Sequence, residues 1–238
     1  TKLTKDEHDL FLRYRPYFSN MEDIVEIIDG GQNPTGIYKW IKNYAAKNGR
    51  IEKVSEFNQV YIPNDENLIT IILVDHQSLI RKESGLSTKK EAIDKLSEYL
   101  QQARDFYGFS PVLVAQMNRD IANPAYQKMD TFEPTPEQIK DSGTSFEDSD
   151  ICMSLFDPVK FKTSAPTKHD ANKLIDLQTG AKYYRSLKIH KNSWGEDDIR
   201  KGMAFHGAIG HFTELPRYDQ MTQSDYDSIL DGSYFLTK

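Results

Sequence analysis

Apolar residues recur every three or four positions along residues 35–49, where Ile37, Trp40 and Ile41 fall on one face. This spacing is the period of an amphipathic α-helix, whose apolar face packs against a core. An Asn-Pro pair ahead of the run and an Asn-Gly pair behind it are typical start and stop signals. The pattern therefore predicts a helix over residues 35–49, with Trp40 in the core.

Shorter apolar runs, bounded by Gly, Pro, Asn and Asp, predict strands in the first third of the chain. These runs cover residues 24–28, 57–62 and 68–74. The last run is apolar on both faces, which is typical of a parallel strand whose sheet is covered by helices on both sides. We therefore expect residues 68–74 at the centre of a sheet.

A second helical period follows that central run. Thr88 and Glu91 have the spacing of a capping box, and the apolar face continues to a stop at Gly108. A second apolar strand follows at residues 111–115. A strand, a helix and a strand of these lengths form a right-handed crossover, which predicts an α/β fold with a mostly parallel sheet flanked by helices.

The second half of the chain is more polar and less periodic. A long polar loop covers residues 118–141, and further strands are predicted at residues 151–156 and 183–190. Residues 203–212 have the pattern of a closing hairpin near the C-terminus. The tail, residues 217–238, is polar and rich in Tyr and Asp, so we expect it to pack only partly.

Composition limits the classes of function that remain open. The chain has 238 residues, and its 30 Lys and Arg against 36 Asp and Glu give a net charge of −6, which excludes a bulk polycation. Its single cysteine, Cys152, excludes an internal disulfide and favours a reducing compartment. The longest apolar run is far shorter than the roughly 20 residues of a membrane span. We therefore expect a globular cytoplasmic protein without a membrane helix.

Polar side chains follow both strands of the crossover. Asp75 ends the run at residues 68–74, and an apolar strand ending in Asp is the sequence form of a Walker B element, whose carboxylate orients water on Mg²⁺. Gln116 and Arg119 follow the next strand, where an amide can sense a phosphate. Ligands bind beyond the carboxyl ends of parallel strands. A capping Asp and a solvated loop start remain the structural alternatives.

A third polar group lies just before the strand at residues 151–156. Lys140, Ser142, Gly143 and Thr144 combine a cation, hydroxyls and backbone N–H groups, which suit phosphodiester oxygens. The alternative is a Ser/Gly turn with a capping acid.

A metal-hydrolase site is the weakest of the interpretations. Histidines in strands and loops are more often satisfied by hydrogen bonds than by metals, and none here has the spacing of a metal motif. Asp148 and Asp150 could hold a cation, although acids that precede a strand are mostly solvated caps. The histidines considered are His76, His190, His206 and His211.

Taken in order, four motifs resemble the RecA-like motor domain of DnaB-type replicative DNA helicases, and phage-type members most closely. The resemblance covers residues 1–215, so we expect a partial motor domain there and a C-terminal tail at residues 216–238. The motifs lie at residues 72–79, 112–119, 140–150 and 187–192.

The resemblance implies a role for each matching residue. Asp75 corresponds to the Walker B residue that holds Mg²⁺ through water, and Gln116 to the sensor of the γ-phosphate. Lys191 corresponds to the hairpin lysine that reaches the nucleotide of a neighbouring subunit. Outside the resemblance, Lys191 and Arg200 are the candidates to replace the family's arginine finger. Lys140, Asp141 and Gly143 correspond to the loop that follows single-stranded DNA, and Arg119 and Ser142 are further candidates for DNA contacts.

Two departures from the family pattern affect the expected activity. The sequence has no GxxxxGK[ST] loop, so the resemblance implies that the Walker A loop and the catalytic Glu lie upstream of Thr1. Ser193 stands where the family has its arginine finger, and a hydroxyl cannot supply that planar cation.

The resemblance thus implies part of an ATP- and Mg²⁺-dependent helicase that translocates on single-stranded DNA and unwinds duplex DNA. It also implies a homo-hexamer, a possible loader or primase partner, and action in the cytoplasm of a bacterial cell or a phage-infected host. The alternative is a catalytically incomplete DNA-binding or assembly subunit derived from such a motor.

Overall fold

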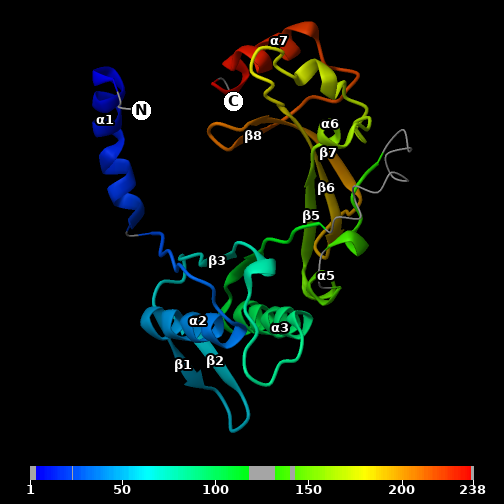
Figure 1. Cartoon of the computed structure of the whole chain (residues 1–238). Coiled ribbons are helices and arrows are strands. Elements are labelled where there is room, and N and C mark those ends of the chain that lie inside the picture. Colours follow the sequence, from blue (N-terminus) through cyan, green and yellow to red (C-terminus); the bar gives the residue numbers. More distant parts are fainter. Residues whose placement is uncertain (1–3, 23, 118–131, 140–142, 237–238) are drawn as a thin grey trace. The chain divides into compact units, whose positions relative to one another are not determined.

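The chain divides into two compact units, Thr1–Gln32 and Asn33–Lys238. Figure 1 shows the elements of each unit. The computed structural model describes residues 4–22, 24–117, 132–139 and 143–236.

The first unit is built around one helix, α1 (Lys5–Glu22), which the periodicity of the sequence does not predict. The strand expected at residues 24–28 does not form. Ile24 and Ile27 are 82% and 86% exposed, and the described part of this unit contains no strand to which they could pair. An extended segment becomes a strand only where a neighbour supplies its backbone hydrogen bonds, so this prediction is wrong.

The second unit begins with α2 (Pro34–Asn48), the helix predicted over residues 35–49. The side-chain oxygen of Asn33 accepts a hydrogen bond from the backbone N–H of Gly36 at 2.7 Å, which satisfies one of the free donors at the helix start. Ile41 is buried as expected, but Trp40 is 42% exposed. The prediction that Trp40 lies in the core is therefore wrong, because the buried stripe of α2 passes beside it.

A β-hairpin follows α2. It joins β1 (Gly49–Lys53) to β2 (Gln59–Pro63), and the two strands pair antiparallel. The second strand was expected from the apolar run at residues 57–62. The first was missed because its residues are mostly polar and exposed, so they carry no apolar alternation.

The predicted crossover is confirmed. β3 (Ile71–Val74) pairs parallel with β4 (Ser110–Leu113), and α3 (Lys89–Tyr107) connects them. The Thr88 hydroxyl accepts the backbone N–H of Glu91, and Gly108 ends the helix in the left-handed region at φ 70°. Glycine reaches that region without a steric penalty, which is why the helix stops there.

The remaining strands form a four-stranded antiparallel sheet in the order β5-β6-β7-β8. Within the described residues, the expectation of a mostly parallel sheet is therefore met only by β3 and β4. The predicted hairpin at residues 203–212 is confirmed. Parallel pairing needs a long crossover, whereas the turns from β6 to β7 and from β7 to β8 are short. The longer connection from β5 to β6, residues 157–183, contains only the short helices α6 and η4. The strands are β5 (Ile151–Phe156), β6 (Tyr184–Asn192), β7 (Ile199–His206) and β8 (His211–Glu214).

Short helices complete the unit. Among the described residues, no helix is long and apolar enough to cross a membrane. The short elements are η1 (Gln77–Leu79), η3 (Pro136–Gln138), α5 (Thr144–Asp148), α6 (Pro158–Phe161), η4 (Ala171–Leu174), α7 (Gln223–Asp231) and η5 (Ser233–Phe235).

The hydrophobic interior forms separate clusters. One joins α2 and α3 to the inward faces of β3 and β4, and includes Ile41, Leu96 and Leu100. Another joins η4, the four-stranded sheet and the C-terminal segment. The polar tail packs more fully than its composition indicates, because buried apolar residues of the tail contribute to this second cluster. These tail residues are Tyr226, Ile229, Tyr234 and Phe235.

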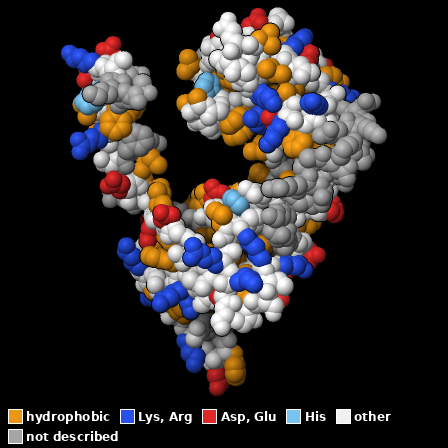
Figure 2. All heavy atoms as spheres, in the orientation of Figure 1, with side chains coloured by type: hydrophobic (Ala, Val, Ile, Leu, Met, Phe, Trp, Pro, Cys, Tyr) orange, Lys and Arg blue, Asp and Glu red, His pale blue; other side chains and the backbone are white. Residues whose placement is uncertain are grey.

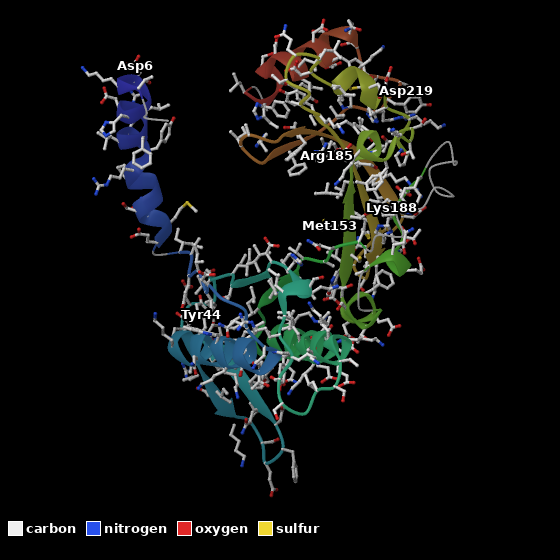
Figure 3. All side chains as sticks on the ribbon, in the orientation of Figure 1. Asp6, Tyr44, Met153, Arg185, Lys188 and Asp219 are labelled. Atoms are coloured by element: carbon white, nitrogen blue, oxygen red, sulfur yellow. The ribbon has the colours of Figure 1, made fainter. Side chains whose placement is uncertain are left out.

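The outward faces of several strands remain exposed. Ile71 and Leu73 of β3 are 66% and 65% exposed, although the sequence predicted helices on both sides of this strand. Met153, which Figure 3 labels on β5, is 60% exposed. Hydrophobic side chains are accordingly visible among charged ones on the surface in Figure 2. The described helices α2 and α3 cover only the inward side of the parallel pair.

One histidine is half-buried on the four-stranded sheet. His190 of β6 lies with its Nε2 atom 2.8 Å from the Ser154 hydroxyl of β5. Burial is the main cause that lowers the pKa of His190 below its usual 6.5, and the charges of Lys188 and Arg200 add to it. Glu133 and Asp198 act in the opposite direction. The neutral imidazole is therefore the form that the folded sheet favours.

The packing of the tail leads to a first prediction. Ile229→Ala, at a fully buried position of α7, should lower the free energy of unfolding by about 2–5 kcal/mol through lost burial and a residual cavity. Leu236→Ala, at a position 86% exposed, is the matched control and should change it by less than about 0.5 kcal/mol. Urea unfolding followed by circular dichroism measures both. Equal effects would show that the tail does not pack as described.

The half-buried His190 leads to a second prediction. Because the pKa of His190 is lower in the folded state, the unfolded chain takes up its proton first as the pH falls. The stability from neutral His190 is complete above pH 6.5 and is lost as the pH decreases below that value. Urea unfolding between neutral and mildly acidic pH should show that His190→Gln loses less unfolding free energy than the unmodified protein does. The control, His8→Gln at an exposed position of α1, should keep the full loss.

Candidate functional site

The ends of β3 and β4 bring Asp75 and Gln116 to the same edge of the parallel pair. Pairing continues past the strands, because the backbone N–H of Val114 donates to Val74 at 3.0 Å and that of Gln77 donates to Val114 at 2.9 Å. Asp75 is exposed, and its carboxylate has no hydrogen bond or ion pair with any described residue. A carboxylate in this state is available to a hydrated cation.

A side-chain contact that the sequence did not predict joins the two strand ends. The Nε2 atom of His76 lies 3.1 Å from the amide nitrogen of Gln116. The amide can donate to this imidazole nitrogen when the nitrogen carries no proton. The other imidazole nitrogen is buried and has no hydrogen-bond partner among the described residues. From the sequence, we considered His76 only as a metal ligand. The signal for its contact with Gln116 was its position directly after Asp75.

Most of the predicted DNA contacts lie outside the described residues: Arg119, Lys140, Asp141 and Ser142. Gly143 is described and occupies the N-cap position of α5, with φ −75° and ψ −31°. A Cβ built at Gly143 would meet no atom within 4 Å, so neither its backbone angles nor crowding requires glycine there.

Lys191, the predicted nucleotide contact, faces α5 instead. Its ammonium donates to the backbone carbonyls of Phe146 at 3.3 Å and Glu147 at 2.7 Å. It also lies 5.7 Å from the centroid of the Phe146 ring. A lysine at carbonyls near a helix C-terminus is favourable, because these groups carry partial negative charge. To reach the nucleotide of another subunit, Lys191 would have to leave both carbonyls.

Arg200, the further candidate, belongs to a cluster of four charges on the four-stranded sheet. Its guanidinium pairs with Glu133 at 2.8 Å and with Asp198 at 3.0 Å. Lys188, which Figure 3 labels, pairs with the same two acids at 2.9 and 3.1 Å. Hydrogen bonds from Lys188 and Arg200 lower the pKa of Asp198. The described contacts of Arg200 are thus with these acids and not with Asp75 or Gln116.

Asp148 and Asp150 bind side chains of α3. The hydroxyl of Ser97 donates to the Asp148 carboxylate at 2.6 Å, and Arg104 pairs with Asp150 at 2.9 Å. The described residues contain no group of three or more His, Cys, Asp or Glu side chains that could hold a metal ion. The two acids are therefore explained by contacts within the protein.

Ser193, at the position of the family's arginine finger, is exposed in the turn between β6 and β7. Its backbone N–H donates to the carbonyl of Asp150 at 2.8 Å. The hollow beside Tyr61 and the hollow beside His169 are not lined by Asp75 or Gln116. Both Asp75 and Gln116 are exposed.

Comparison with known proteins supports the resemblance at the level of structure. No protein-family model matches the sequence, and no curated protein matches it. One similar solved structure is a DnaB-like replicative helicase, from a study that describes the structure and its interactions with primase. The TM-score is 0.55 at 16% identity, over 80% of this chain and 37% of that one.

Another similar structure is the ATPase domain of a phage helicase, with a TM-score of 0.54 at 16% identity, over 78% of this chain and 52% of that one. The chain therefore spans about a third to a half of the length of these structures. Such low identity shows the fold alone. Over about four fifths of its length the chain therefore shares the fold of part of these DnaB-type helicase structures, as its motif order indicated.

Proposed function

We propose that the chain is part of an ATP-dependent DNA helicase motor of the DnaB type, which translocates on single-stranded DNA and unwinds duplex DNA. The observation that carries this proposal is the pair Asp75 and Gln116, brought to one edge by parallel strands within a helicase-type fold. In such a motor the subunits form a hexamer in the cytoplasm of a bacterial cell or phage-infected host, and a primase or loader is the class of partner that fits.

The residues present fit part of a Mg²⁺–nucleotide site. The exposed carboxylate of Asp75 would hold the hydrated Mg²⁺, and the amide of Gln116 would respond to the terminal phosphate. Bound Mg²⁺ would neutralise charge on the phosphates. The sequence contains no GxxxxGK[ST] loop to grip those phosphates, so this part of the site has to come from residues outside this sequence.

A net charge of −6 is compatible with DNA binding, because backbone contacts depend on a few local cations and not on total charge. The resemblance gives this role to the loop of Lys140, Asp141 and Gly143, and Arg119 and Ser142 are further candidates. In this proposal Lys191 contacts the nucleotide of a neighbouring subunit, with Arg200 as a further candidate.

A second candidate function is that of a non-catalytic DNA-binding or assembly subunit. Its support is Ser193, which is exposed in the turn where the family carries an arginine. A subunit without that cation and without a phosphate-binding loop could still occupy a place in a ring and bind the DNA strand.

The DNA contact is tested by Lys140→Ala. Removing one phosphate contact should weaken binding of a fluorescent oligo(dT), and should flatten the plot of log affinity against log salt by about one unit. Fluorescence anisotropy between about 50 and 200 mM salt measures both. Lys201→Ala removes a cation that pairs with Glu214, and is the control that should leave the slope unchanged. An unchanged slope in Lys140→Ala would contradict the assigned contact.

The motor itself is tested by ATP hydrolysis. The chain alone should hydrolyse little ATP, and activity should appear when it is joined to a segment that carries a GxxxxGK[ST] loop and a catalytic Glu. Asp75→Asn in the joined protein should then reduce activity about 10- to 100-fold, as for other residues that hold a metal through water.

The same assay separates the two candidate functions. Activity that returns with the added segment alone supports the motor. Activity that requires Ser193→Arg as well supports the non-catalytic subunit. ATP hydrolysis by the chain alone at the rate of the joined protein would contradict the proposal that part of the nucleotide site comes from another segment.

A further inference from the structure

Helix α5 is only one turn long, yet other elements hold most of its residues. Its own backbone hydrogen bonds at the N-terminal end run from Phe146 and Glu147 back to the carbonyl of Gly143, both at 3.1 Å. An isolated helix of this length has too few hydrogen bonds to be stable in water. The conformation of α5 therefore depends on contacts with its neighbours.

One of these neighbours is strand β6. The ammonium of Lys191 donates to the carbonyls of Phe146 and Glu147, as described above. Carbonyls near the end of a helix lack intrahelical partners and need other donors. A single side chain of β6 thus satisfies two backbone groups of α5.

Another neighbour is α3. The hydroxyl of Ser97 donates to the carboxylate of Asp148 at 2.6 Å, and Arg104 donates to the Asp148 carbonyl at 3.1 Å. Ser97 is only 5% exposed, and it lies on the face of α3 that continues into the buried core. The last residue of α5 is therefore attached to a helix that the core holds in place.

The first turn of α5 contacts the segment that follows Asp75. The hydroxyl of Ser145 is 3.5 Å from the side-chain oxygen of Gln77, which is fully buried two residues after Asp75. Gly143, the described residue of the predicted DNA loop, is the N-cap residue of the same helix. A shift of α5 would therefore move Gly143 directly.

We propose that α5 is the positioning element for DNA binding, and that Ser97 and Lys191 are the positioning residues that hold it. The proposal rests on the DNA-binding function proposed above. Ser97 and Lys191 act through the helix and do not contact DNA themselves. Lys191 holds α5 when it is not at a nucleotide, and leaves α5 to reach one. Weakening either contact should thus loosen α5, displace Gly143 and reduce affinity for single-stranded DNA.

Ser97→Ala gives the sharper test, because it removes one hydrogen bond and leaves the charge of the protein unchanged. Alanine is also the best helix former, so α3 should remain intact. A hydrogen bond to a carboxylate is stronger than one between neutral groups. We expect Ser97→Ala to weaken binding of a fluorescent oligo(dT) about three- to tenfold, as measured by fluorescence anisotropy at fixed salt.

Lys191→Met tests the contact from β6, and Lys201→Met is its control for the loss of one positive charge. Lys201 lies on the neighbouring strand β7 and pairs with Glu214. Lys191→Met should weaken oligo(dT) binding by at least as much as Ser97→Ala, whereas Lys201→Met should have little effect. Hydrogen–deuterium exchange of residues 143–149 should be faster in Ser97→Ala and in Lys191→Met than in the unmodified protein and in Lys201→Met.

The two measurements separate failure of this inference from failure of the proposed function. If the unmodified chain does not bind oligo(dT), the DNA-binding function is wrong. If it binds and both variants exchange faster at α5 but keep full affinity, the contacts are purely structural and the positioning role is wrong. Unchanged exchange in both variants would show that Ser97 and Lys191 do not hold α5.

Discussion

Burial of one face of α3 is the interaction on which the rest of the second unit depends. Leu96 and Leu100 pack with α2 and with the inward faces of β3 and β4. This packing fixes the crossover, which places Asp75 and Gln116 at the same edge of the strands. Removing apolar area from water is the main favourable contribution to folding, so the geometry of the candidate site follows from the core beneath it.

The same helix, α3, also contacts polar segments of the molecule. Ser97, beside the apolar stripe, reaches α5, and Arg104 one turn before the helix ends reaches the start of β5. Lys191 holds α5 from the other sheet. The contacts are few and directional, and they attach α5 and the start of β5 to α3 and β6. In the proposed motor, connections of this kind would transmit a change at the nucleotide to the DNA contacts.

The sequence predicted the elements whose signals are local. The helix that begins after Thr88 carries its cap, its apolar stripe and its terminal Gly108 within one segment, and the structure confirms all three. The expectations that failed depend on which other parts of the chain a segment packs against. The run at residues 24–28 has the composition of a strand but no strand beside it among the described residues, and Trp40 falls just outside the buried stripe of α2.

By itself, the sequence determined the parallel crossover, the position of Asp75 and Gln116 at its strand ends, and the order of motifs that indicated a helicase-type motor. The crossover and the strand-end positions follow from periodicity and caps, which act between residues close in the chain. The helicase-type motor was indicated only by the resemblance of the ordered motifs to a known family. Only the tertiary structure decided that His76 contacts Gln116, that Arg200 joins a charge cluster, and that Lys191 binds α5. Side-chain contacts of this kind join residues tens of positions apart, and no local pattern records which partner packing will bring within hydrogen-bonding distance.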